Sequence, residues 1–129
     1  MIRREPEILY EDSQILVCRK EAGMAVQSAG IRQMDLESCL KIYLAGKQPG
    51  RVPYLGIIQR LDQPVEGVLV FAKTAEAAAG LSRQLQQGKI KKEYLALVEG
   101  CVWEGAGRLE DYLETVSYTH LTLPTNSRV

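Results

Sequence analysis

The chain of 129 residues contains 16 basic and 16 acidic residues, so it lacks the overall positive field that holds nucleic acid indiscriminately. Its hydrophobic fraction of 46% and its charged fraction of 25% are typical of a globular domain with a buried core. The sole histidine, His120, lies near the end of the chain. Residues 1–115 therefore cannot use Ser-His-Asp, Cys-His or histidine-rich metal chemistry.

The three cysteines, Cys18, Cys39 and Cys101, lie far apart and include no C-x-x-C pair. Their spacing supports neither a zinc site nor a disulfide framework, and it favours buried free thiols in a cytoplasmic protein. No apolar run approaches the 18 residues or so of a membrane span, and the first residues lack the apolar stretch of a signal peptide.

The first part of the chain predicts the antiparallel start of a sheet. A short apolar run at 8–10 is followed by expected strands at 14–19 and 24–27, and turn-forming residues separate the three segments. A helix is predicted over 36–45, with Asp35 as its N-cap and Gly46 as its stop. Its apolar face consists of Leu36, Cys39, Leu40, Tyr43 and Leu44.

The central feature of the sequence is a polar loop, 59–64, between two apolar runs. We expect a buried strand at 55–58 and a second, fully buried strand at 68–72. Arg60 and Asp62 then lie where the strands end, and a partly desolvated carboxylate in that position is often used for chemistry. The structural alternatives are that Asp62 forms an Asx-type turn or pairs with Arg60.

After the second central strand, Thr74 is the predicted N-cap of a helix over 75–87, which Gly88 ends. Its inward face is expected to contain Ala77, Ala78, Leu81 and Leu85. The alternating residues 94–99 predict another strand.

These elements predict an α+β fold with a mostly antiparallel or mixed sheet and helices packed on one side of it. We expect one domain over 1–115, followed by a tail at 116–129 that is foreign to it. The core of the tail resembles a peptide translated from sequencing-adaptor DNA; the alternative is an ordinary frayed terminus.

Taken together, Arg60-Leu61-Asp62, Gly67 and Phe71-Ala72-Lys73 resemble the signature of the RluA-type pseudouridine synthases. Three further motifs resemble that family in the same order: residues 8–23 with Lys20, residues 92–100 with Tyr94, and residues 109–113. The resemblance covers 8–115. The chain departs from the family pattern at Glu21, Gln59 and Val65-Glu66. A later arginine-bearing motif of the family has no counterpart in it. The chain is therefore similar to the first half to two-thirds of such a catalytic domain.

The resemblance implies isomerisation of uridine to pseudouridine in rRNA or tRNA, without a cofactor or a metal. Asp62 matches the nucleophile of the family. Tyr94 matches the active-site tyrosine, whose ring stacks on a flipped uracil and whose hydroxyl takes the C5 proton; the alternative is a tyrosine that fills the core. Arg60 would hold a phosphate or fill the gap left by the flipped base, or else form a salt bridge with Asp62 or Glu66.

RNA is the expected partner, and a monomer without membrane contact is favoured. The cluster that would bind the RNA backbone consists of Arg83, Lys89, Lys91 and Lys92, which we call the basic cluster. A solvated helix end explains the same residues, and the loop 47–51 is a weaker second candidate. Two other functions remain open: a non-catalytic RNA-binding module, and an inactive fragment whose open sheet edges keep it from folding stably.

Overall fold

The computed structural model describes residues 5–28, 34–102, 105–108 and 110. It divides the chain into two compact units, Met1–Lys92 and Glu93–Val129. All the helices and strands of the described residues belong to the first unit. The predicted foreign tail at 116–129 lies outside the described residues.

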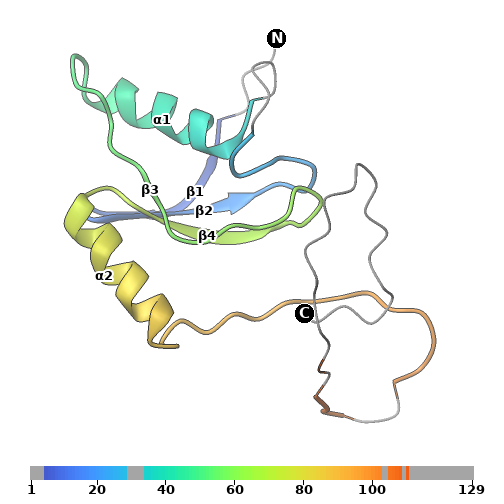
Figure 1. The fold of residues 1–129 in the computed structure, drawn as a ribbon. Helices are drawn as coiled ribbons and strands as arrows, with labels where there is room; N and C mark the ends of the chain where they lie inside the picture. The colour runs from blue at the N-terminus through green and yellow to red at the C-terminus, as the bar shows by residue number, and fades with distance from the viewer. Residues whose placement is uncertain (1–4, 29–33, 103–104, 109, 111–129) are drawn as a thin grey trace, which may run out of the picture. The chain divides into compact units, whose positions relative to one another are not determined.

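The first unit is a four-stranded antiparallel sheet with two helices (Figure 1). The strands follow the order β1-β2-β4-β3 across the sheet, and each neighbouring pair is antiparallel. This confirms the predicted α+β fold. The elements are β1 (Glu7–Glu11), β2 (Ile15–Lys20), α1 (Leu36–Lys47), β3 (Gly56–Ile57), β4 (Gly67–Ala72) and α2 (Ala75–Gln86). Within the described part of the chain, neither helix is long and apolar enough to cross a membrane.

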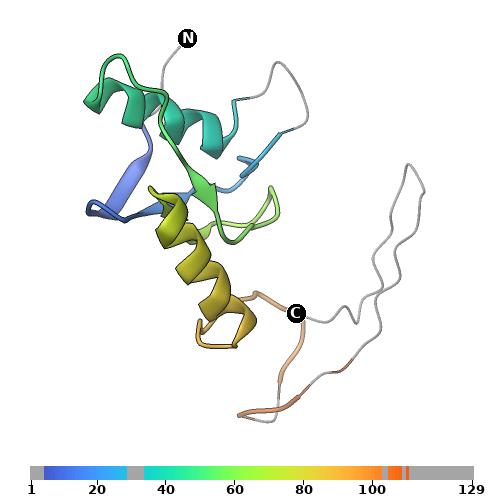
Figure 2. The ribbon, with the colours of Figure 1, turned by 60° about the vertical axis from the view of Figure 1, so that its left-hand side comes forward.

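The two helices lie on opposite faces of the sheet (Figures 1 and 2), so the prediction that they pack on one side was wrong. The reason is visible in β4, which has buried residues on both of its faces. Leu69 and Phe71 are buried toward α1. Ala72 on the other face is buried as well, whereas Val68, further along that face, is 61% exposed. On the α2 side, a Cβ at Gly56 would lie 3.1 Å from the Cβ atoms of both Ala72 and Ala78, so small residues allow a close approach.

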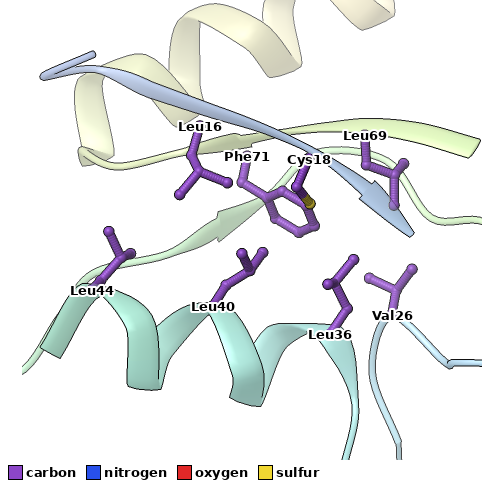
Figure 3. Packing of buried hydrophobic residues seen from close by; sticks show 8 residues of the cluster. All are labelled: Leu16, Cys18, Val26, Leu36, Leu40, Leu44, Leu69 and Phe71. Atoms are coloured by element: carbon purple, nitrogen blue, oxygen red, sulfur yellow. The ribbon is translucent and has the colours of Figure 1, made fainter. Parts of the chain in front are cut away.

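The hydrophobic core lies between the sheet and α1 (Figure 3). Leucines recur at every fourth position of α1 and form one apolar stripe along the helix. This stripe packs against the inward-facing residues of β2 and β4, which form one apolar face of the sheet. The buried cluster consists of Leu16, Cys18, Val26, Leu36, Leu40, Leu44, Leu69 and Phe71. Burial raises the pKa of the Cys18 thiol to about 11, while Cys39 is partly exposed and Cys101 is exposed, so buried thiols were predicted correctly for Cys18 only.

Both predicted N-caps are confirmed. Asp35 Oδ1 accepts the Ser38 N–H at 2.8 Å, and Thr74 Oγ1 accepts the Ala77 N–H at 3.1 Å. The first helix nevertheless runs through Gly46, which does not have the positive φ that would stop it, and ends at Lys47 with Gln48 as its C-cap.

Two predicted strands do not form among the described residues. The segment 24–27 instead supplies backbone acceptors for the first turn of α1: the carbonyls of Ala25 and Val26 accept the N–H groups of Leu36 and Glu37 at 2.9 and 3.1 Å. The segment 94–99 has no neighbouring strand in the described part of the chain, and its Leu95 and Leu97 are fully exposed. Alternation alone does not make a strand without an edge to pair with.

A partly buried carboxylate joins three elements at the end of the sheet where β2 begins. Glu11, at the end of β1, accepts hydrogen bonds from Lys47 at 2.8 Å, from Lys73 at 2.6 Å and from the Tyr43 hydroxyl at 2.7 Å. Burial by itself raises the pKa of Glu11, but these three donors outweigh it and lower the pKa to about 2. The carboxylate therefore holds β1, α1 and the end of β4 together in its charged form.

We expect Glu11→Gln to lower the free energy of unfolding at pH 7 by about 1–3 kcal/mol, because two ammonium groups lose a charged acceptor. A pKa lowered in the folded state stabilises the fold above the unfolded value of 4.5, and this contribution is lost as the pH falls from 4.5 through about 2. Urea unfolding from pH 7 to pH 2 should show the difference in the free energy of unfolding between the two proteins shrinking over that window.

The matched control is Glu7→Gln, which removes an exposed carboxylate from the same strand. A difference that stays constant to pH 2 would contradict the assignment.

Candidate active site

The loop between β3 and β4 carries Asp62 and Arg60, and a backbone turn gives it its shape. The Val65 N–H donates to the Asp62 carbonyl oxygen at 2.9 Å, so the chain turns at Gln63 and Pro64. The Asp62 side chain is exposed and not partly desolvated as predicted. Its carboxylate does not make the turn, which is closed by the main chain, and it forms no hydrogen bond within the described residues.

The predicted ion pairs of Arg60 do not occur within the described residues. Arg60 is exposed and forms no salt bridge with either Asp62 or Glu66 there. Glu66 pairs instead with Arg19 on β2, with 3.0 Å between Oε1 and Nη1, and Arg19 also pairs with Glu7. The guanidinium of Arg60 and the carboxylate of Asp62 are therefore both open to solvent on one short loop.

A buried lysine lies directly under this loop. Lys20, the last residue of β2, is fully buried, and its ammonium group donates to three main-chain carbonyl oxygens. The acceptors are those of Glu21 at 2.9 Å, Met24 at 2.6 Å and Gln63 at 3.0 Å. The ammonium thus connects the turn after β2 to the residue that follows Asp62.

Gly23 adds two further bonds between the same two segments. Its N–H donates to the Gln63 carbonyl at 2.8 Å, and its own carbonyl accepts from the Gln63 side-chain amide at 2.9 Å. Gly23 has a φ of 90°, a left-handed conformation that glycine adopts without steric cost. The turn after β2 therefore presents main-chain groups that fix Gln63 on both its backbone and its side chain.

Leu61 anchors the loop from inside. It packs against the hydrophobic core, half-buried, between the exposed side chains of Arg60 and Asp62. A Cβ at Gly67 would lie 2.9 Å from Leu61 Cδ1, so the glycine leaves room for this leucine. The apolar residue is held inward while its two polar neighbours remain accessible.

Lys20 and Asp62 also interact through their charges. Burial lowers the pKa of Lys20, and the negative charge of Asp62 opposes this shift. Sequence analysis matched Lys20 to a family motif but assigned it no role. The sequence does indicate that Lys20 is buried. Leu16 and Cys18, two positions apart, face inward from β2, and the same period of two places Lys20 on that face.

The other predicted site residues lie away from this loop in the chain. Tyr94 belongs to the second unit, where its side chain is 53% exposed. The four residues of the basic cluster surround the end of α2 and are all exposed, and no salt bridge engages them within the described residues. A positive φ at Gly88 (69°) ends that helix, as predicted.

The 47–51 loop borders a cavity of about 320 Å³ at the Glu11 end of the sheet. In the antiparallel register of β2 and β4, Lys20 pairs with Gly67 and Ile15 pairs with Ala72, so this cavity and the Asp62 loop lie at opposite ends of the sheet. Its two lysines, Lys47 and Lys73, are already bound to Glu11. The cavity therefore adds no free cation to the Asp62 loop.

Most of the chain matches one protein family. Residues 14–126 match the family model described as RNA pseudouridylate synthase. The chain is 41% identical over 97 residues to the ribosomal large subunit pseudouridine synthase D of Zymomonas mobilis, covering 73% of this chain and 31% of that protein. It is 35% identical over 100 residues to the tRNA pseudouridine synthase C of Haemophilus ducreyi, covering 78% of this chain and 40% of that protein.

A third relative, the ribosomal large subunit pseudouridine synthase C of Buchnera aphidicola subsp. Baizongia pistaciae, is 38% identical over 122 residues, which cover 94% of this chain and 34% of that protein. Among solved structures, the human RNA pseudouridylate synthase domain containing 4 shares the fold, with a TM-score of 0.55 and 22% identity over 64% of this chain and 30% of that one. The chain thus spans 31–40% of the length of these three curated relatives.

Proposed function

Because this chain belongs to the RNA pseudouridine synthase family, of the RluA type, we propose that it carries the nucleophile of an enzyme that converts uridine in RNA to pseudouridine. The nucleophile is Asp62. One observation carries the proposal: the Asp62 carboxylate is exposed, yet its loop is fixed from below by the buried Lys20 ammonium. A fixed and accessible carboxylate is what covalent catalysis on a bulky polymer requires.

The reaction is an isomerisation, so no atom is gained or lost overall. The C1′–N1 bond of the uridine breaks, the uracil turns, a C1′–C5 bond forms, and the proton on C5 leaves while N1 gains one. A carboxylate suits this sequence because it can form a covalent bond with the substrate and leave again. The uridine must also leave its base stack to reach Asp62, as substrates do in other enzymes that act on a base.

Two other residues are assigned roles in the same reaction. Arg60 is exposed two positions from Asp62 and forms no ion pair within the described residues, so its guanidinium is open to bind a phosphate or to fill the place of the flipped base. Tyr94 would stack on the uracil, and its hydroxyl would accept the C5 proton.

The basic cluster supplies the contact with the RNA backbone in this proposal. Arg83, Lys89, Lys91 and Lys92 are exposed cations in a chain whose formal net charge is zero, and salt bridges within the described residues do not neutralise them. Such cations bind phosphates with release of counterions, so the contact is independent of base sequence.

A chimera tests the proposed function, because the chain spans 31% of the Zymomonas mobilis relative. Residues 14–102 of this chain would replace the matching segment of that protein. The chimera should release tritium from RNA that contains 5-tritiated uridine, since formation of the C1′–C5 bond expels the hydrogen on C5. The unmodified relative is the positive control. A folded chimera without tritium release would contradict the proposal.

The second candidate function is an RNA-binding module without catalysis. The unneutralised basic cluster favours it, since RNA binding by these cations does not need the rest of a catalytic domain. An inactive but folded chimera, combined with salt-dependent RNA binding by the 129-residue chain, would establish this module in place of the enzyme. An inactive fragment is the third candidate, and the fully exposed Leu95 and Leu97 are the feature that would make the isolated chain aggregate.

A further inference from the structure

Arg19 is a partly exposed cation beside the loop that carries Asp62. Its neighbours on β2, Cys18 and Lys20, are buried toward the core, so the alternation of the strand turns Arg19 to the other face of the sheet. In the antiparallel register Arg19 pairs with Val68, the second residue of β4, at the end of the sheet where the Asp62 loop enters that strand. The proposed reaction does not yet use this arginine.

Two carboxylates bind different atoms of the Arg19 guanidinium. Glu7 Oε2 accepts a hydrogen bond from Nε at 2.5 Å, and Glu66 Oε1 forms an ion pair with Nη1 at 3.0 Å. A guanidinium has five N–H donors in one plane, and no hydrogen bond engages those of Nη2 within the described residues. The side chains of Arg19, Glu7 and Glu66 are 35%, 54% and 58% exposed, so a large ligand can reach them.

We propose that Arg19 binds a phosphate of the substrate RNA by exchanging partners: the phosphate takes the place of the Glu66 carboxylate, while Glu7 stays on Nε and orients the guanidinium. The inference rests on the proposed function, since a uridine at Asp62 is what brings the RNA backbone to this end of the sheet. The ligand is the phosphodiester group next to the reacting nucleotide, and Glu66 itself does not touch the RNA.

Charge and bond strength favour this exchange. With both carboxylates in place, two negative charges outweigh the single positive charge of Arg19, so a phosphate binds only when one carboxylate moves away. Ion pairs between exposed side chains contribute little to stability, and Glu66 has only to turn into the solvent that already surrounds most of it. The phosphate offers two oxygens to the planar guanidinium, and such bidentate, charge-assisted pairs are among the strong hydrogen bonds.

The position of Glu66 brings this contact close to the reacting group. Glu66 lies four positions after Asp62, and the bond from the Val65 N–H to the Asp62 carbonyl at 2.9 Å turns the segment between them. Even a fully extended chain would separate the two α-carbons by no more than about 14 Å. A flipped nucleotide turns about its own backbone, so the phosphates on either side of it stay near the site. Arg19 therefore holds the backbone beside the uridine that reacts.

The contact is tested by measuring the affinity of the chimera for a uridine-containing RNA at several salt concentrations. Arg19→Gln should weaken binding by about 3- to 10-fold and should reduce the slope of log affinity against log salt by about 0.7–1, because one phosphate contact is lost. Lys41→Gln is the matched control, since it removes an exposed cation that is also paired with a carboxylate, Glu37, at 2.9 Å on α1. An unchanged slope in a folded Arg19→Gln chimera, or an equal change in Lys41→Gln, would overturn the proposal.

A double-mutant cycle tests the exchange itself. Glu66→Ala should strengthen RNA binding by about two- to fivefold, because the phosphate no longer competes with a carboxylate, and this gain should vanish when Arg19→Gln is also present. The same gain in both backgrounds would mean that Glu66 only repels RNA in general, and the exchange would be wrong. If Arg19→Gln does not fold, Arg19→Lys replaces it: affinity should fall while the salt slope stays, because the charge remains and the planar donors are lost.

The failure of this proposal is distinguishable from that of the proposed function. In an active chimera, Arg19→Gln should raise the KM for RNA and leave the rate of tritium release at saturating RNA within about twofold, because Arg19 binds backbone and not the reacting atoms. A large loss of rate at saturating RNA would contradict a binding role. An inactive wild-type chimera would overturn the proposed function, and the same salt series on the 129-residue chain would then decide whether Arg19 contacts RNA.

Discussion

Replacing Asp62 with asparagine in the active chimera is expected to reduce pseudouridine formation by at least about 10³-fold. The amide has nearly the shape of the carboxylate, and the turn of the loop is closed by the Asp62 main-chain carbonyl, which the substitution keeps. What is lost is the negative oxygen that forms and breaks the covalent bond. Tritium release from 5-tritiated uridine measures the loss directly.

The comparison needs a binding measurement and a matched variant. RNA affinity should change little in Asp62→Asn, because phosphates are bound by cations and not by this carboxylate. Glu66→Gln removes the other exposed carboxylate of the loop and should retain activity, since its partner is Arg19 and the loop is held through Gln63. Activity in Asp62→Asn at the level of the unmodified chimera would exclude Asp62 as the nucleophile.

Replacing Phe71 with alanine is expected to lower the free energy of unfolding by about 3–5 kcal/mol. Phe71 is the sole phenylalanine of the chain, it has 0% exposure, and it lies in the middle of the cluster between β4 and α1 (Figure 3). Since domains of this size are stable by only about 5–15 kcal/mol, the substitution removes a large share of the total. Urea denaturation followed by circular dichroism measures the change.

Val68→Ala is the matched control, because Val68 lies on the same strand but faces away from α1 and is 61% exposed. We expect it to cost less than about 1 kcal/mol. Similar losses in the two variants would mean that Phe71 and Val68 do not differ in burial, contrary to the arrangement described above.

The features that sequence reasoning predicted correctly are those with local causes. Asp35 and Thr74 cap their helices with bonds to N–H groups three residues further along the chain, so the sequence alone contains both partners. The strand that contains Leu16 and Cys18 was recognised because β-branched and apolar residues bounded by turn residues favour a strand wherever it pairs. The Asp62 loop was found because it interrupts two apolar runs.

The features that were missed depend on partners far away in the chain. The segment 24–27 forms no strand because its carbonyls bond to the start of α1, and the exposure of Asp62 depends on how the whole loop folds over Leu61. The helices lie on opposite faces because β4 is buried toward α1 at Phe71 and on its other face at Ala72, and a run of consecutive apolar residues does not show which helix covers which face. Lys20 was assigned no role because its third acceptor, Gln63, lies 43 positions away.

The Gly23 turn has a consequence for how the activity of such a protein can change. Gln63 is bound through Gly23 and Lys20, residues 40 and 43 positions earlier in the chain, so the shape of the Asp62 loop depends on the end of β2 and on the turn that follows it. In the proposed enzyme, substitutions in that turn would alter the rate of the chemistry while every residue of the loop stays the same. A variant with a damaged turn would then be mistaken for a catalytic mutant, although the proposed nucleophile is intact.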